Sequence, residues 1–191
     1  MIDIDEKAAL LVIDVQRGFD DESHWGKRNN PDCEANIVLL MDAWERGGRP
    51  IVLVRNDSTS PGSPLRPEHP GNRLKPQIEG RKHDLLVTKS VHSSFHGSAD
   101  LHGWLTSRGI SQLVITGIAT NVCCETTTRV GSDLGYDVLF VIDATHTFDS
   151  RHPDGSLVTA DVFTRVTETT LQGEFARVVR TAEVLARTDA E

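Results

Sequence analysis

Short apolar runs recur along the chain and are typical of β-strands. The first run, residues 8–15, is apolar at nearly every position, which indicates a strand covered on both faces. Runs this short fit strands better than helices. Further strands are expected at residues 51–54, 85–88, 113–116 and 138–142, with a sixth, weaker one at 176–179.

A different spacing separates these runs and predicts helices between them. Within residues 34–46, apolar side chains recur every three or four positions, for example at Ile37, Leu40 and Trp44. Helices are likewise expected at residues 99–107, 123–134 and 156–171. Strands alternating with helices predict an α/β fold, a three-layer α/β/α arrangement around a six-stranded, mostly parallel sheet. Residues 1–191 are expected to form one domain.

One long segment, residues 57–84, interrupts this alternation. It holds five of the chain's eight prolines and little helical periodicity. Loops of this length usually contact a ligand or a partner. Ligands of open parallel sheets bind beyond the carboxyl ends of the strands, so the polar residues at those ends are the candidates for a functional site.

The overall composition narrows the partners and the location of the protein. The formal net charge is −8, which argues against nucleic-acid or anionic-membrane partners and favours a small-molecule substrate. No apolar run approaches the ~20 residues of a membrane span, and the acidic start lacks the features of a signal peptide. Three cysteines, two of them adjacent, form no disulfide framework. A cytoplasmic protein is therefore expected.

Three reactive residues lie at the ends of predicted strands. Cys123 follows the fourth strand, in the first turn of a helix that Thr120 or Asn121 can cap. The helix dipole there favours the thiolate, although a cysteine that merely packs in the core is an equal alternative. Asp14 ends the first strand, where a buried carboxylate needs a partner. Lys89 ends the third strand.

Together these three side chains suit the hydrolysis of a carbonyl–nitrogen bond. Asp14 could take the thiol proton of Cys123 and later return it to a departing amine. Lys89 could hold the carboxylate in place and lower the cost of nearby negative charge. The backbone N–H groups of Ala119 and Cys123 could accept the oxyanion of a tetrahedral intermediate.

Motifs spread over nearly the whole chain add a family resemblance. They are Asp14-Val15-Gln16 with Phe19, Lys89 with Ser94-Phe95, the run from Thr116 to Cys123, Glu125, Thr126, Asp133-Leu134-Gly135-Tyr136 and Asp143-Ala144. In this order they resemble the isochorismatase-like cysteine hydrolase superfamily. The resemblance implies a Rossmann-like strand order 3-2-1-4-5-6 and a catalytic triad of Asp14, Lys89 and Cys123. It also implies a cis peptide near Ile118–Ala119 that shapes the oxyanion hole, and assembly into homo-oligomers such as dimers or tetramers.

The implied strand order raises a geometric requirement. The third strand adjoins neither the first nor the fourth, so Lys89 must reach over the second strand to meet Asp14.

Two departures from the family's best-known members narrow the expected chemistry. Enzymes that cleave isochorismate cut a vinyl ether and generally lack the nucleophilic cysteine, so Cys123 points away from that reaction. Nicotinamidases carry an Asp-x-His metal site after the second strand, whereas this chain has Asp57-Ser58-Thr59. We therefore expect no metal and no cofactor. The expected activity is an amidohydrolase that acts on an amide, ureido, carbamoyl or lactam bond through a thioester intermediate.

Several further residues are assigned with less support. The candidates for the substrate pocket are Gln16, Phe19, Trp25, Arg55, His92 and Phe95. Cys124 adjoins Cys123 but points about 100° away on a helix, so it is expected to be buried packing. A Cys–His dyad with His92 or His146 as the base is the rival mechanism. A non-catalytic, oligomeric small-molecule-binding scaffold and an isochorismatase-type vinyl-ether hydrolase are the alternative functions.

Overall fold

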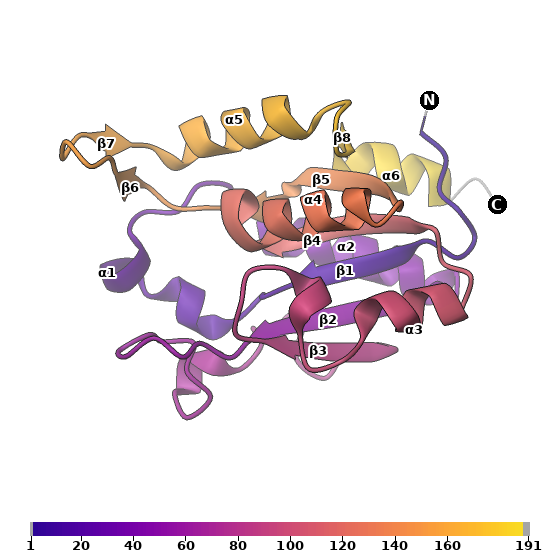
Figure 1. The fold of residues 1–191 in the computed structure, drawn as a ribbon, viewed down its shortest axis with the longest axis horizontal. Coiled ribbons are helices and arrows are strands. Elements are labelled where there is room, and N and C mark those ends of the chain that lie inside the picture. The colour runs from indigo at the N-terminus through magenta and orange to yellow at the C-terminus, as the bar shows by residue number, and fades with distance from the viewer. Residues whose placement is uncertain (1, 189–191) are drawn as a thin grey trace.

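The computed structural model describes residues 2–188, which form a six-stranded sheet between layers of helices (Figure 1). The strands are β1 (Ala9–Ile13), β2 (Ile51–Asn56), β3 (Leu85–Lys89), β4 (Gln112–Ile118), β5 (Asp137–His146) and β8 (Arg177–Val179). Their order in the sheet is β3-β2-β1-β4-β5-β8, and every neighbouring pair is parallel. The predicted α/β class and strand order are confirmed, with β8 as the sixth strand.

Helices cover the two faces of the sheet. Behind it in Figure 1 lie α2 (Cys33–Arg46) and α6 (Thr181–Thr188), and in front lie α3 (Leu101–Ser107) and α4 (Glu125–Asp133). Helix α5 (Ala160–Leu171) runs along the upper edge of the view. None of the helices within residues 2–188 is long and apolar enough to cross a membrane.

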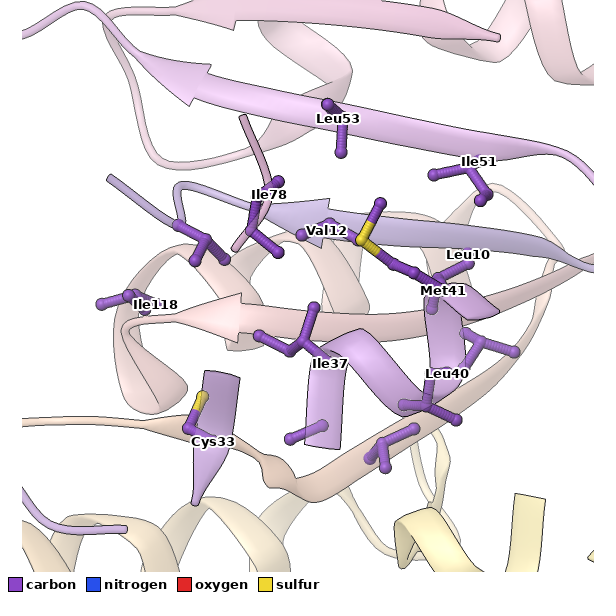
Figure 2. Close-up of a cluster of buried hydrophobic side chains, with 14 of the residues drawn as sticks. Leu10, Val12, Cys33, Ile37, Leu40, Met41, Ile51, Leu53, Ile78 and Ile118 are labelled. Carbon is purple, nitrogen blue, oxygen red and sulfur yellow. The ribbon is translucent and has the colours of Figure 1, made fainter. Parts of the chain in front are cut away.

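The alternation of side chains along β1 creates two separate cores. Leu10 and Val12 belong to the core beneath α2, whereas Leu11 and Ile13 belong to the core on the opposite face. In Figure 2, side chains of α2 such as Met41 lie over this first face of β1. Burying an aliphatic side chain of this size stabilises the fold by about 1.5–3 kcal/mol, which explains why β1 is apolar at every position.

The structure corrects two predicted helices. The helix expected at residues 156–171 begins only at Ala160, because β7 (Leu157–Val158) instead pairs with β6 (Ser150–Arg151) in an antiparallel hairpin. The helix expected from residue 123 begins at Glu125 and follows a π-helical turn, Thr120–Cys124. Helix α6, the short helix α1 (Glu22–Trp25) and the β6–β7 hairpin were not predicted.

The carboxyl ends of the strands are surrounded by irregular segments. Residues 57–84 contain only short turns, including the 3-10 turn Pro70–Asn72, yet Leu65 and Ile78 of this loop are buried. This loop, α1 and the β6–β7 hairpin gather at the left of Figure 1. Ligand-binding groups of open parallel sheets collect at this edge.

Candidate active site

The side chains of Asp14, Lys89 and Cys123 meet at the carboxyl edge of the sheet. Lys89 Nζ lies 2.6 Å from Asp14 Oδ2 and 3.4 Å from Cys123 Sγ. Lys89 stands beside Asn56 of β2 in the register of the sheet, so its side chain does reach over β2 to the end of β1. The three residues predicted from the strand ends are thus in direct contact through one ammonium group.

Backbone geometry at the end of β1 positions Asp14. Its φ is 53°, a left-handed conformation that aspartate and asparagine adopt more readily than most residues. The Asp14 N–H donates to the Val54 carbonyl of β2, and its own carbonyl accepts from the N–H of Gln16. Sparsely populated backbone conformations of this kind cluster at functional sites.

The chain that carries Cys123 is shaped by a glycine and by an unusual turn. Gly117 lies opposite Ile13 with φ 126°, and a Cβ there would come within 2.0 Å of the Ile13 carbonyl oxygen. The Ile118–Ala119 peptide bond is cis, as the family resemblance implied. Cys123 then lies in the π-helical turn, a geometry frequent at functional sites.

The cap predicted for this helix is absent from the described structure. Ala119 occupies the N-cap position without a side-chain hydrogen bond. The Thr120 hydroxyl instead donates to Thr145 Oγ1, and Asn121 Oδ1 accepts from the Thr147 hydroxyl. Both candidate caps therefore tie the turn to the end of β5.

Burial dominates the electrostatics of the site. The side chains of Asp14 and Lys89 are both fully buried as an ion pair. Desolvation raises the pKa of Asp14 above its usual value, although the charge of Lys89 opposes this shift. Burial is the largest single influence on Lys89 and disfavours its charge, but the interactions with Asp14 and Cys123 together outweigh burial, and the pKa of Lys89 is raised.

The same burial outweighs the helix-dipole effect that was expected to favour the thiolate of Cys123. The pKa of Cys123 is raised to about 12, chiefly because the thiol is desolvated by burial. The negative charge of Asp14 also raises this pKa, and its effect is larger than the opposing effect of the Lys89 charge. Cys123 is therefore a neutral thiol in the unliganded protein. Activation of this thiol requires a base that accepts its proton. Asp14 Oδ1, which has no hydrogen-bond partner among residues 2–188, is an acceptor with an open position.

A cavity of about 290 Å³ opens beside Cys123. Four aromatic side chains contribute to its wall: Phe19, Trp25, Phe148 and Phe163. The Phe19 and Trp25 rings are 4.8 Å apart between centroids, and the Phe148 ring lies 5.9 Å from Phe19 and 5.8 Å from Trp25. This volume is at the lower end of small-molecule sites, and the rings offer a flat apolar surface.

The remaining polar groups on the wall come from several strand ends. They are Asn56, His92, Asn121, Thr147, Asp149 and Ser150. Ala119 also lines the cavity, as Cys123 does.

Of the six predicted pocket residues, three line this cavity and three do not. Phe19, Trp25 and His92 are on its wall. Gln16 is instead fully buried, where its amide bonds to both backbone groups of Asn56 and to the Asn72 carbonyl. Arg55 is paired with Asp57, and the Phe95 ring stacks on Tyr136.

Two further assignments concerned His146, as a candidate base, and Cys124, as a packing residue, and the structure places both side chains in the interior. His146 is fully buried, 3.9 Å from Glu34, and burial lowers its pKa to about 3. It is not on the cavity wall, unlike His92. Cys124 is fully buried, as predicted. Within residues 2–188 there is no group of three or more His, Cys, Asp or Glu side chains that could hold a metal ion.

Sequence reasoning missed nine residues of the cavity wall, which are Asn56, Leu65, Asn121, Val122, Thr147, Phe148, Asp149, Ser150 and Phe163. Thr147, Phe148 and Asp149 come directly after β5, so the strand-end rule could have identified them. Phe163 had no such signal, because α5 reaches the site only through the β6–β7 hairpin.

Comparison with protein families and curated proteins gives a consistent match. The isochorismatase domain model matches residues 8–170. An uncharacterized isochorismatase-family protein of Bacillus subtilis, YrdC, is 34% identical over 182 residues, covering 95% of this chain and 96% of that protein. A ureidoacrylate amidohydrolase, RutB, of Pseudomonas syringae is 32% identical, covering 73% of this chain and 71% of the relative. Nicotinamidase 3 of Arabidopsis thaliana is 28% identical, covering 79% of each chain.

Solved structures show the same similarity. An isochorismatase-family protein from Chromobacterium violaceum superposes with a TM-score of 0.93 at 34% identity, covering 100% of this chain and 98% of the other. A cysteine hydrolase from Pseudomonas syringae pv. phaseolicola superposes with a TM-score of 0.88 at 26% identity, covering 100% of this chain and 96% of the other.

Proposed function

The chain belongs to the isochorismatase family of hydrolases, and from this premise we propose that it is a cysteine amidohydrolase that cleaves a carbon–nitrogen bond of a small molecule. The observation that carries the proposal is the contact of Lys89 Nζ with both Asp14 and Cys123 at the edge of a cavity. A base, a cation and a nucleophile at one cavity are the parts that acyl transfer needs.

The reaction begins with a proton transfer inside the substrate complex. Because the pKa of Cys123 is raised to about 12, the thiol stays protonated until a carbonyl carbon is in place. Asp14 then takes the proton as the sulfur attacks, and the carbonyl π electrons move to oxygen. The N–H groups of Ala119 and Cys123 stabilise this oxyanion. Lys89 stays protonated and offsets the negative charge that moves between the thiol and the carboxylate.

Collapse of the tetrahedral intermediate breaks the carbon–nitrogen bond. Asp14 returns its proton to the departing nitrogen, which leaves as ammonia or an amine, and the acyl group remains on Cys123 as a thioester. Asp14 next takes a proton from water as the water oxygen attacks the thioester. The second collapse releases the acid and restores the thiol, so one water is consumed for each bond cleaved.

Two relatives support carbon–nitrogen hydrolysis over vinyl-ether cleavage. The ureidoacrylate amidohydrolase and the nicotinamidase are both named for hydrolysis of such bonds. In this chain the acid after β2, Asp57, is held by Arg55 at 2.9 Å and by the Asn72 amide at 3.0 Å. Because Asp57 is already bound by these two side chains, its environment favours an amidohydrolase that works without a metal.

A screen for ammonia release tests the proposal directly. Primary amides, carbamoyl and ureido compounds and lactams are incubated with the wild type, with Cys123→Ala and with Cys124→Ala, and lactams are followed by mass instead of ammonia. We expect turnover with the wild type and Cys124→Ala and none above background with Cys123→Ala. Turnover that survives in Cys123→Ala overturns the mechanism. Binding without turnover in the wild type favours the scaffold instead.

A further inference from the structure

Helix α5 reaches the cavity beside Cys123 through its first turn, where Phe163 lines the wall. The β6–β7 hairpin leads into this helix at the left of Figure 1, and its residues Ser150, Arg151 and Leu157 are exposed. An exposed two-residue hairpin does little to fix the place where the next helix begins. The position of Phe163 therefore depends on side chains that fasten the first turn of α5 to the rest of the protein.

Asn29, in the loop after α1, makes such a connection. Its Nδ2 donates to Asp161 Oδ1 and to Thr164 Oγ1, each at 3.0 Å, and these two residues flank Phe163 along the chain. Its Oδ1 accepts the Thr147 N–H at 3.0 Å, and its own backbone N–H donates to the Thr147 carbonyl at 3.1 Å. Because a backbone N–H can only donate, the bond from Thr147 fixes which end of the Asn29 amide faces α5.

Thr147 carries the connection onward to the turn that bears the nucleophile. The Thr147 side chain is buried, and its hydroxyl donates to Asn121 Oδ1 at 2.5 Å, two residues before Cys123. Thr147, Asn121 and Phe163 all line the cavity, whereas Asn29 does not. Asn29 therefore acts on the cavity through wall residues that come from three elements: the end of β5, the π-helical turn and α5.

Other contacts hold the remainder of α5. The Thr167 hydroxyl donates to Glu125 Oε2 at 2.7 Å, and the Ala160 N–H donates to Asp149 Oδ1 at 2.7 Å. Loss of the Asn29 contacts should therefore loosen the turn between these two points without releasing the helix.

We infer that Asn29 is a positioning residue that holds Phe163 in place relative to the turn that carries Cys123. The inference rests on the proposed function and adds to it a residue that sets how tightly the substrate is held. A wall contact of this kind is made in the ground state and in the transition state alike, so its loss raises KM more than it lowers kcat. The contact of Cys123 with Lys89 does not involve Asn29 and stays in place.

An exchange of two side chains tests this connection. Asn29→Asp places a second carboxylate against Asp161, whereas the double variant Asn29→Asp/Asp161→Asn restores one acid and one amide, with the donor on the opposite side. In both variants the new carboxylate still accepts the Thr147 N–H. The neighbouring cations Lys27 and Arg28 meet the same net charge in the double variant as in the wild type, so they cannot account for a rescue.

Steady-state kinetics separate positioning from a general loss of structure. On an amide identified by the ammonia screen, Asn29→Asp should raise KM by about three- to tenfold, the range expected for one misplaced aromatic contact, and lower kcat by less than about twofold. The double variant should return KM to within about twofold of the wild type. The control is Asn36→Ala, which removes a 2.7 Å hydrogen bond from α2 to the Asp143 carbonyl of β5 and should leave KM unchanged. An unchanged KM in Asn29→Asp, or no recovery in the double variant, overturns the inference and leaves the proposed function intact.

Two further measurements keep the test independent of amide turnover. Iodoacetanilide brings a phenyl ring into the cavity when it alkylates Cys123, whereas iodoacetamide does not. In Asn29→Asp, the alkylation rate with iodoacetanilide should fall by about three- to tenfold relative to that with iodoacetamide, and the double variant should reverse this fall. Exchange of backbone amide hydrogens in Asn29→Asp, followed by mass spectrometry, should rise within residues 160–164 and not within residues 167–171.

These measurements distinguish failure of the inference from failure of the proposed function. If the wild type hydrolyses no amide while the alkylation ratio and the hydrogen exchange change as expected, the proposed function fails and the positioning role of Asn29 stands. An alkylation ratio that stays at the wild-type value in Asn29→Asp overturns the inference, whether or not amides are hydrolysed.

Discussion

Replacing Lys89 by methionine tests the buried ion pair at the centre of the site. Methionine keeps most of the volume of the side chain and removes its charge. Asp14 then loses its 2.6 Å partner, while its second oxygen already has no hydrogen-bond partner within residues 2–188. Removing one member of a buried pair leaves an uncompensated charge and costs about 3–5 kcal/mol. For a domain of this size that corresponds to a fall in Tm of about 6–20 °C.

The loss of stability in Lys89→Met should also depend on pH, in a direction that the pKa of Asp14 sets. Without Lys89, the folded-state pKa of Asp14 rises further above its value in the unfolded chain. Between those two values the folded protein binds more protons than the unfolded one, so its stability falls as pH increases. The deficit of Lys89→Met relative to the wild type should therefore be small near the usual carboxyl pKa and fully developed at neutral pH.

Urea unfolding at several pH values measures this deficit. The control is the double variant Asp14→Asn/Lys89→Met, because asparagine tolerates the φ of 53° and removes the second charge. We expect the double variant to recover most of the lost stability, as replacements of whole buried pairs usually do. A loss below about 1 kcal/mol in Lys89→Met at pH 7, or a deficit independent of pH, would refute the reasoning, since a buried pair predicts more.

The remaining predictions concern the base, the thiol and the backbone. Because the pKa of Asp14 is raised by burial and its base form is required, kcat/KM should fall with decreasing pH through a value above the usual carboxyl pKa; a pH-independent acid side would contradict this. Because the pKa of Cys123 is about 12, its alkylation by iodoacetamide, followed by mass spectrometry, should rise about tenfold per pH unit past 8.5; a plateau near 8.5 would indicate an ordinary thiol. Gly117→Ala should unfold at markedly lower urea than Gly135→Ala, because only its new Cβ would meet backbone, 2.0 Å from Ile13 O; equal midpoints would show that the strands can separate there.

The strand pattern predicted the fold because its signals are local. A nearly continuous apolar run such as residues 8–15 favours a strand covered on both faces, and Leu10 and Leu11 do enter opposite cores. The order of the strands did not follow from the pattern and came from the family resemblance. The β6–β7 hairpin was missed because two-residue strands carry too little periodicity to detect.

The strand-end rule identified the residues that meet at the site but not their electrostatics. Asp14, Lys89 and Cys123 were placed at one edge from sequence alone, whereas the sequence did not show how strongly burial acts on the charges of Lys89 and Cys123. Consequently the expected effect of a helix dipole on Cys123 was outweighed by desolvation in the structure. Gln16 and Arg55 lie at strand ends as predicted but are not on the cavity wall, because their side chains bond within the framework.

The central claim is that Cys123 is the nucleophile, and the pair Cys123→Ala and Cys124→Ala tests it most directly. The two cysteines are adjacent and both buried, but only Cys123 lines the cavity and contacts Lys89. On an amide identified by the ammonia screen, kcat/KM should fall by about 10³-fold or more in Cys123→Ala, because the covalent step is lost, and stay within about threefold of the wild type in Cys124→Ala. Wild-type turnover by Cys123→Ala would contradict the account.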